Sequence, residues 1–375
     1  MKPFFAITRS LHAWGGALLA LLLLMSSVTG TLLLWKPEYL KLTIPAARAD
    51  FDPTPETLAP LIERIEAQLD PNEIVQIQLP TRDFALAKVT MFDTHYAYVD
   101  TQGNIVDEWF LNERWEEWLY DLHHRLLLGN AGLTIIGFVG MTMLLLLIAG
   151  VVTFWPMRRG FRHGFRIRST ARPHLLTAHR NIGIVEALPF GLTLVTGIVL
   201  AFPTQVEERF LQPVRMSQDY SDALSLGVDD VSGGDSGDWL PAMRRALATF
   251  RAGEVRSVQV ANDISNYRII GVKQPEEWHP DGMSRVYVDE AGGWMDVRYD
   301  ATALPLIERT YNTIYPLHTG KLGSFAYKLL LTVSGLLVAL LSTLGLTSFL
   351  QGKLRGRGSP LAADRNARRA GRQAS

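Results

Sequence analysis

Four apolar segments, each long enough to cross a lipid bilayer as a helix, are the strongest constraint on how this chain folds. An α-helix rises about 1.5 Å per residue, so about 20 apolar residues span the hydrocarbon core. We place these helices at 10–35, 132–155, 179–203 and 325–350. The first follows a short basic stretch but ends without a small-residue cleavage site, so we expect it to be retained as an anchor.

Basic residues are distributed unequally between the segments that connect these helices. The loop at 156–178 and the tail at 351–375 are rich in arginine, whereas acidic residues outnumber basic ones in the long loops at 36–131 and 204–324. Basic residues beside membrane helices stay on the cytoplasmic side. The pattern predicts a bacterial inner-membrane protein with cytoplasmic termini and two periplasmic loops. Because this rule explains the basic segments, they do not indicate nucleic-acid binding.

The order helix, extramembrane loop, helix occurs twice, which predicts a tandem duplication. Each loop begins with an amphipathic helix, at 54–69 with Thr54 as its cap and at 238–250. Alternating strands follow at 73–79, 84–92 and 95–110, and at 255–261, 267–274 and 285–299. The last strand segment of each loop is a hairpin that turns at Asp-x-x-Gly. We therefore expect a four-helix membrane bundle with two small α+β domains, the second preceded by a Ser-, Asp- and Gly-rich linker at 217–237.

Four of the nine histidines lie beside these four helices. His12 and His179 lie at the cytoplasmic ends of the first and third, and His123 and His318 at the opposite face before the second and fourth. Because the bilayer core is about 30 Å thick, only histidines at the same face can bind the same metal ion or cofactor. The same pairs, His12 with His179 and His123 with His318, are equivalent under the duplication.

Paired neutral imidazoles are typical axial ligands of low-spin b-type haem, one on each side of the iron. The chain contains no cysteine, which excludes thiolate-bound iron–sulfur clusters and covalently attached c-type haem. The four histidines therefore predict two b-type haems that carry electrons across the membrane.

Several neighbouring residues leave alternatives open. His124 points about 100° away from His123 on a helix, so only one of them can face a given haem, and we favour His123. His174 is a second cytoplasmic candidate that we expect to be interfacial. Arg125 and Arg180 are candidate partners of haem propionates or, equally, of lipid headgroups. We expect surface positions for the remaining histidines, which are His95, His163 and His279.

Glycines recur at matched places in the two halves. Gly16 and Gly183 follow the cytoplasmic histidines by four residues, and Gly150 and Gly345 lie late in the second and fourth helices. Small residues allow helices to approach closely, and they also leave space for a flat macrocycle between helices. The sequence does not separate these two uses.

Glu186 is the single acidic residue within the four membrane segments. An intramembrane carboxylate is costly, and proton uptake, quinone binding and a hydrogen bond to a ligand histidine are three roles that fit it. The competing interpretation is a helix kinked at Pro189, with Glu186 paired to an arginine near the interface.

The segments "LHHRLLLG", "AHRNIG" and "YPLHTGKLG" resemble the PepSY-associated transmembrane family, and the resemblance extends over essentially the whole chain to Leu350. Members of that family include inner-membrane ferric-siderophore reductases with two b-haems in the bundle and PepSY-like periplasmic domains. The resemblance implies haem-dependent reduction of a periplasmic ferric siderophore, with quinol or a cytoplasmic reductase as the electron donor. The chain departs from a plain Leu-His-Arg signature at His12, which Ala13 and Trp14 follow.

Two other functions fit parts of the pattern. An anchored periplasmic PepSY module that binds or inhibits other proteins needs no redox group, but such an anchor needs no matched histidines. A siderophore permease is the other alternative, although the helices carry no central charged pathway and no broken-helix pattern.

Overall fold

The computed structural model describes the chain apart from residues 1, 161–168, 217–237, 263–266, 290–296 and 358–375. The chain divides into two compact units, which we name the helical unit and the sheet unit. The helical unit comprises Met1–Thr31, Asn130–Ile198 and Leu329–Ser375, and the sheet unit comprises Leu32–Gly129 and Val199–Lys328. Each unit therefore takes residues from both halves of the chain.

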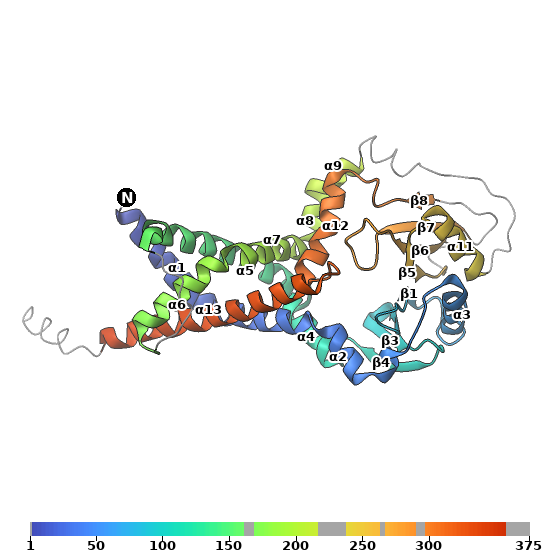
Figure 1. Ribbon diagram of the computed structural model, residues 1–375, viewed down its shortest axis with the longest axis horizontal. Coiled ribbons are helices and arrows are strands. Elements are labelled where there is room, and N and C mark those ends of the chain that lie inside the picture. Colours follow the sequence, from blue (N-terminus) through green and yellow to red (C-terminus); the bar gives the residue numbers. More distant parts are fainter. Residues whose placement is uncertain (1, 161–168, 217–237, 263–266, 290–296, 358–375) are drawn as a thin grey trace, which may run out of the picture. The chain divides into compact units, whose positions relative to one another are not determined.

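The helical unit is a bundle of long helices (Figure 1). Its elements are α1 (Lys2–Leu33), α5 (Gly129–Phe154) with a 3-10 turn at Trp155–Gly160, α6 (Arg172–Val185), α7 (Ala187–Ala201) and α13 (Phe325–Arg357). Three of the four predicted spans, in α1, α5 and α13, are continuous helices long and apolar enough to cross a membrane. The third predicted span is instead a pair, α6 and α7, bent by 65° at Glu186, so the expectation that no helix is broken is wrong for this segment.

Pro189 accounts for the position of this bend. A proline inside a helix has no N–H to donate, and its ring clashes with the carbonyl group four residues earlier. For Pro189 that carbonyl belongs to Val185, the last residue of α6. The helix accordingly breaks at Glu186 and restarts at Ala187.

The sheet unit contains one antiparallel sheet of eight strands. They run in the order β4-β3-β2-β1-β5-β6-β7-β8. The first half supplies β1 (Ile74–Gln78), β2 (Ala87–Met91), β3 (His95–Val99) and β4 (Ile105–Phe110). The second half supplies β5 (Glu254–Gln259), β6 (Tyr267–Lys273), β7 (Ser284–Asp289) and β8 (Val297–Tyr299). Six of these eight strands lie within the segments that the sequence predicts, and β5 and β7 each begin one residue earlier.

The two halves, which the sequence predicts as separate small domains, share this sheet and one core. Strand β1 pairs with β5, with Ile77 opposite Val258. The helices α3 (Pro55–Glu66) and α11 (Trp239–Thr249) pack against each other on the same side of the sheet (Figure 1). Trp239 is fully buried, and its Nε1 donates to Glu66 Oε2 at 2.8 Å. Joining the halves edge to edge covers an edge strand that each would otherwise expose.

The first predicted hairpin turn has the expected chemistry. Gly103 has φ +87°, and its N–H donates to the Asp100 carbonyl at 3.0 Å. The Asp100 carboxylate accepts the N–H groups of Gln102 and Asn104. A Cβ at Gly103 would lie 2.9 Å from the Arg64 side chain, so this position favours glycine for space as well as for φ. The turn of the second hairpin and the linker at 217–237 lie outside the described residues.

His123 and His318 lie on short helices of the sheet unit rather than on the spanning helices. His123 is on α4 (Trp115–Arg125), and His318 is on α12 (Leu306–Thr319). Residues of positive φ end both helices: Leu126 (53°) and Leu127 (59°) after α4, and Gly320 (70°) after α12. The remaining elements of the described part of the unit are α2 (Lys36–Thr43), 3-10 turns at Pro45–Arg48 and Phe92–Thr94, α8 (Pro203–Val206), a π-helical turn at Glu207–Leu211 and α9 (Gln212–Arg215).

Candidate functional site: two histidine pairs

His12 of α1 and His179 of α6 face each other inside the helical unit. Their ring centroids are 6.0 Å apart, with an angle of 64° between the ring planes. A metal–imidazole bond is about 2.0–2.1 Å long, so two imidazoles on opposite sides of one metal ion have ring centres roughly 6 Å apart. The spacing of this pair therefore matches ligation of a single ion from two sides.

A backbone carbonyl fixes each of these two rings. His12 Nδ1 lies 2.8 Å from the carbonyl oxygen of Leu146 on α5, and His179 Nδ1 lies 3.1 Å from that of Leu341 on α13. A carbonyl oxygen only accepts, so Nδ1 must carry the hydrogen and donate it. In the neutral imidazole, Nε2 then keeps its lone pair, which is the form that binds a metal.

Glycines make room for both rings. A Cβ at Gly150 would lie 3.1 Å from His12 Cε1, and a Cβ at Gly345 would lie 3.2 Å from His179 Cε1. Each glycine follows by four residues the carbonyl that its histidine contacts, and therefore lies one helical turn away on the same face. These two glycines admit imidazole rings rather than a neighbouring helix backbone.

A cavity of about 440 Å³ adjoins the histidine pair within the helical unit, and both rings line it. Gly16 and Gly183 also line it. A Cβ at Gly16 would meet nothing within 4 Å, and one at Gly183 would meet only the Leu341 side chain, at 3.7 Å. These two glycines therefore border open space. Gly335 serves the other purpose, because a Cβ there would lie 2.1 Å from Thr31 Oγ1, where α13 meets α1.

Two arginines line the same cavity, and only one of them is a sequence-predicted site residue. The predicted residue, Arg180, donates from Nε to Asn181 Oδ1 at 3.1 Å. Arg172, which the sequence analysis did not single out, donates from Nε to the Ser348 carbonyl at 3.0 Å. An adjoining hollow of about 430 Å³ is lined by Arg9, Arg172 and Lys353 and by no acidic residue. An anionic group in the cavity would have cations within reach.

His123 and His318 form the second pair, in the sheet unit. Their ring centroids are 6.3 Å apart, and the ring planes make an angle of 41°. His124 is not part of this pair. Its ring lies against Tyr120 at 5.2 Å, its buried Nδ1 has no hydrogen-bond partner, and burial together with nearby Arg125 lowers its pKa. The structure thus brings His123, rather than His124, to His318.

The other sequence candidates have separate positions. Arg125 Nε is buried and has no hydrogen-bond partner among the described residues, so this nitrogen retains capacity to donate to an anion. His174 is exposed and bonds Ser169.

Glu186 is buried and contacts Ser334 of α13, and no ion pair to an arginine is present in the described part of the chain. His95 pairs with Glu108 in the sheet, His279 stacks on Tyr315, and His163 lies outside the described residues.

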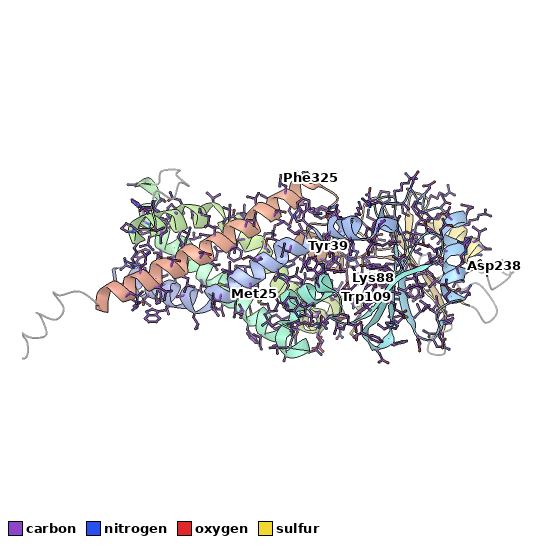
Figure 2. All side chains as sticks on the ribbon, turned by 90° about the horizontal axis from the view of Figure 1, so that it is seen from below. Met25, Tyr39, Lys88, Trp109, Asp238 and Phe325 are labelled. Carbon is purple, nitrogen blue, oxygen red and sulfur yellow. The ribbon has the colours of Figure 1, made fainter. Side chains whose placement is uncertain are left out.

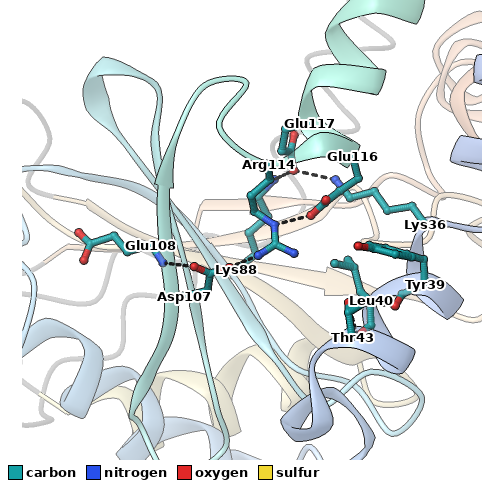
Figure 3. Close-up of polar contacts among 10 residues, drawn as sticks. All are labelled: Lys36, Tyr39, Leu40, Thr43, Lys88, Asp107, Glu108, Arg114, Glu116 and Glu117. Atoms are coloured by element: carbon teal, nitrogen blue, oxygen red, sulfur yellow. Dashed lines mark hydrogen bonds and ion pairs between the residues drawn. The ribbon is translucent and has the colours of Figure 1, made fainter.

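Buried ion pairs hold the helix that carries His123 (Figure 3). Glu117, in the first turn of α4, contacts Lys36 of α2 at 2.7 Å and Lys88 of β2 at 3.2 Å. Beside it, Arg114 bonds both Glu116 and Asp107. Lys88 also lies over the Trp109 ring, 5.8 Å from its centroid (Figure 2). An acid in the first turn is favourable for a helix, and here it also ties α4 to α2 and to the sheet.

The helix that carries His318 has a similar anchor. Glu308, in the first turn of α12, is 1% exposed and accepts two bonds from Arg215. Arg215 also pairs with Glu207. Each histidine-bearing helix of the sheet unit therefore begins at a buried carboxylate held by a cation. In the described residues, no group of three or more His, Asp or Glu is arranged to hold a metal ion, which leaves the two histidine pairs as the candidate sites.

Comparison with known proteins gives one family result. A family model described as the PepSY-associated TM region matches residues 9–351, which include all four paired histidines. No curated protein matches the chain.

The Glu117 contacts predict a measurable effect of pH on stability. Burial raises the pKa of this carboxyl, but Lys36 and Lys88 outweigh burial and hold it below the usual value. The stabilisation is thus fully present above the unfolded-state pKa of about 4.3 and is lost as pH falls through the lower folded-state pKa. We expect Glu117→Gln to destabilise α4 and β2 by roughly 1–3 kcal/mol at neutral pH, measured by hydrogen exchange.

The matched control is Asp52→Asn, which removes an exposed pair with Arg82 and is expected to have a much smaller effect. Equal losses of stability in the two variants would contradict a special role of the Glu117 contacts.

Proposed function

We propose, from the premise that the chain belongs to the PepSY-associated transmembrane family, that it is an electron-transfer protein holding two b-type haems. One haem would be ligated by His12 and His179 and the other by His123 and His318. The observation that carries this proposal is the pair formed by His12 and His179, which we name the inner pair. Its spacing of 6.0 Å, its two Nδ1–carbonyl bonds and the glycines beside its rings together prepare two neutral Nε2 atoms for one iron.

Histidines that serve only packing or the membrane interface do not require this combination. An interfacial histidine is stable with its ring in water or among headgroups. Here both rings are instead turned to carbonyls of neighbouring helices and border an apolar cavity. A bis-imidazole haem has these needs: two oriented rings, a water-poor cavity for the macrocycle, and cations for its propionates.

The chain's own residues supply the rings and the cavity at the inner pair and a cation near each pair. Arg172 and Arg180 border the inner cavity, and Arg125, with its unpartnered Nε, lies two residues after His123. When bound, haem supplies one-electron chemistry, while the protein orients the rings, excludes water and neutralises the propionates. We expect no acid–base catalytic residue beyond the ligands in such a protein.

We further propose that the bundle has four spans and arose by tandem duplication. The inner pair supports this, because a histidine, a carbonyl on another helix and a glycine four residues beyond that carbonyl occur in each half. The strand order supports it too, since β1 and β5 join two runs of four strands, one run from each half of the chain. On this view α6 and α7 are one broken span.

We assign the two ends of the proposed pathway with the positive-inside rule, which concerns orientation. Basic loops beside membrane helices stay on the cytoplasmic side, and the arginine-rich loop immediately precedes α6. His179 lies on α6, so we place the inner pair towards the cytoplasm of a bacterial inner membrane. Electrons would enter there from quinol or a cytoplasmic reductase and leave at the His123–His318 pair. As the family resemblance implies, the acceptor would be a periplasmic ferric siderophore. One electron reduces its iron to the ferrous state, which oxygen-donor chelators hold less tightly.

Reoxidation by a ferric chelate tests this function. Purified protein reduced with dithionite, and freed of excess reductant under anaerobic conditions, should be reoxidised on addition of a ferric hydroxamate. One ferrous ion should appear in a ferrous-specific chelator for each electron lost. Gallium hydroxamate, which has the same shape and charge but is not reduced, is the matched control. Reduced haem that stays reduced with every ferric chelate tried would contradict the reductase assignment.

The glycine beside His12 gives a prediction for the inner site. Gly150→Ala places a methyl group 3.1 Å from His12 Cε1, so the ring must shift by a few tenths of an ångström, which we expect to weaken its Leu146 bond. Disturbing such a supporting contact typically weakens metal binding by roughly 10- to 100-fold. We expect a corresponding loss of haem affinity, measured by haem titration of the apoprotein. Gly191→Ala, whose Cβ would make an ordinary 3.5 Å contact with Leu147, is the control. Unchanged affinity in Gly150→Ala would contradict ligation by His12 in this orientation.

A further inference from the structure

Glu186 lies at the break between α6 and α7, buried inside the helical unit. It is 4% exposed, and its Oε2 lies 2.6 Å from the hydroxyl of Ser334 on α13, which is also 4% exposed. No ion pair to this carboxylate is present among the described residues. Burying a carboxyl group without a cation is costly, so such a group inside a membrane bundle calls for a function.

This contact lies one layer beyond the inner histidine pair. Glu186 follows His179 by seven residues, and Ser334 precedes Leu341 by seven, so α6 and α13 run antiparallel here. Seven residues are two helical turns and about 10 Å along the axis, on the same helix face. The Glu186–Ser334 contact therefore shares its helix faces with the His179–Leu341 contact.

The carboxylate is not required for holding the histidines. In the other half, the residues seven positions from His12 and Leu146 in the same directions are Leu19 and Val139, both apolar. Pro189 suffices to break the helix without an acidic residue. A costly group that only one of two similar contacts carries points to a task in the electron-transfer reaction rather than in the scaffold.

The charged surroundings of Glu186 are simple. Helices α5 and α7 carry no ionisable side chain, α13 carries none between Lys328 and Lys353, and α1 carries none after His12. On α6 the charged or titratable neighbours are His179 and Arg180, and Arg180 keeps its charge at every accessible pH. With His12 and His179 as iron ligands, the charge that changes near Glu186 is that of the haem iron.

We propose that Glu186 is a proton-binding site that takes up a proton when the inner haem is reduced, with Ser334 positioning its carboxyl group. This inference rests on the proposed haem function. The ferric haem attracts the carboxylate anion, and adding one electron removes that attraction. Each reduction would then convert the Glu186 carboxylate and one proton from water to the carboxylic acid, and oxidation would return both. The Ser334 hydroxyl donates to the anion and can rotate to accept from the acid.

The test is the pH dependence of the inner haem's midpoint potential in the purified holoprotein. In the native chain the potential should fall as pH rises, because proton uptake accompanies reduction. In Glu186→Gln and in Glu186→Leu, which copies the residue at position 19, this dependence should be lost. Ser334→Ala should shift the pH range of the dependence. Thr193→Val, which removes a hydroxyl bonded only to the Pro189 carbonyl of its own helix, is the control and should match the native chain.

A second readout identifies the group directly. The reduced-minus-oxidised infrared difference spectrum should contain a protonated-carboxyl band that disappears in Glu186→Gln. A pH dependence that persists in Glu186→Gln and Glu186→Leu would overturn the inference while leaving the haem function in place. Absence of haem from the native protein would instead overturn the proposed function itself.

Discussion

The hydrogen bond from each inner histidine to a backbone carbonyl on another helix is the interaction on which the helical unit's site depends. In a low-dielectric bundle such a bond is strong, and a carbonyl already in a helix can accept it with its second lone pair. It fixes the ring, selects the tautomer that leaves Nε2 for a metal, and joins α1 to α5 and α6 to α13. Gly150 and Gly345 leave room for the rings beside those carbonyls, because a Cβ at either position would crowd the ring.

The sheet unit holds its histidine pair by different physical means. Here the histidine-bearing helices α4 and α12 are short and are anchored at their first turns by buried carboxylates, Glu117 and Glu308. The carboxylates form ion pairs with Lys36, Lys88 and Arg215, and these opposite charges offset part of the desolvation that each buried charge suffers. Continuity of the sheet through β1 and β5 places the strands of both halves on one frame.

The sequence predicted the parts that depend on local pattern. Apolar length located three continuous membrane-length helices and a bent helix pair, and alternation located the strands. The bilayer thickness restricted which histidines can meet, so that both observed ring pairs could be named. It did not predict that the halves share one sheet, because pairing between Ile77 and Val258 depends on the complementarity of two edges that lie far apart in the chain. Nor did it predict the end of α4, where Leu126 and Leu127 adopt positive φ without glycine. Arg172 was not distinguished among many arginines, because only its bond to the Ser348 carbonyl sets it beside the cavity.

Haem quantification in single-histidine variants tests the central claim most directly. The account predicts about two b-type haems per chain in the purified protein. His12→Ala and His179→Ala should each lose the same haem, and His123→Ala and His318→Ala should each lose the other, whereas His124→Ala and His174→Ala should keep both. A protein that remains colourless when expressed with ample haem, or variants that lose haem in other combinations, would contradict the account.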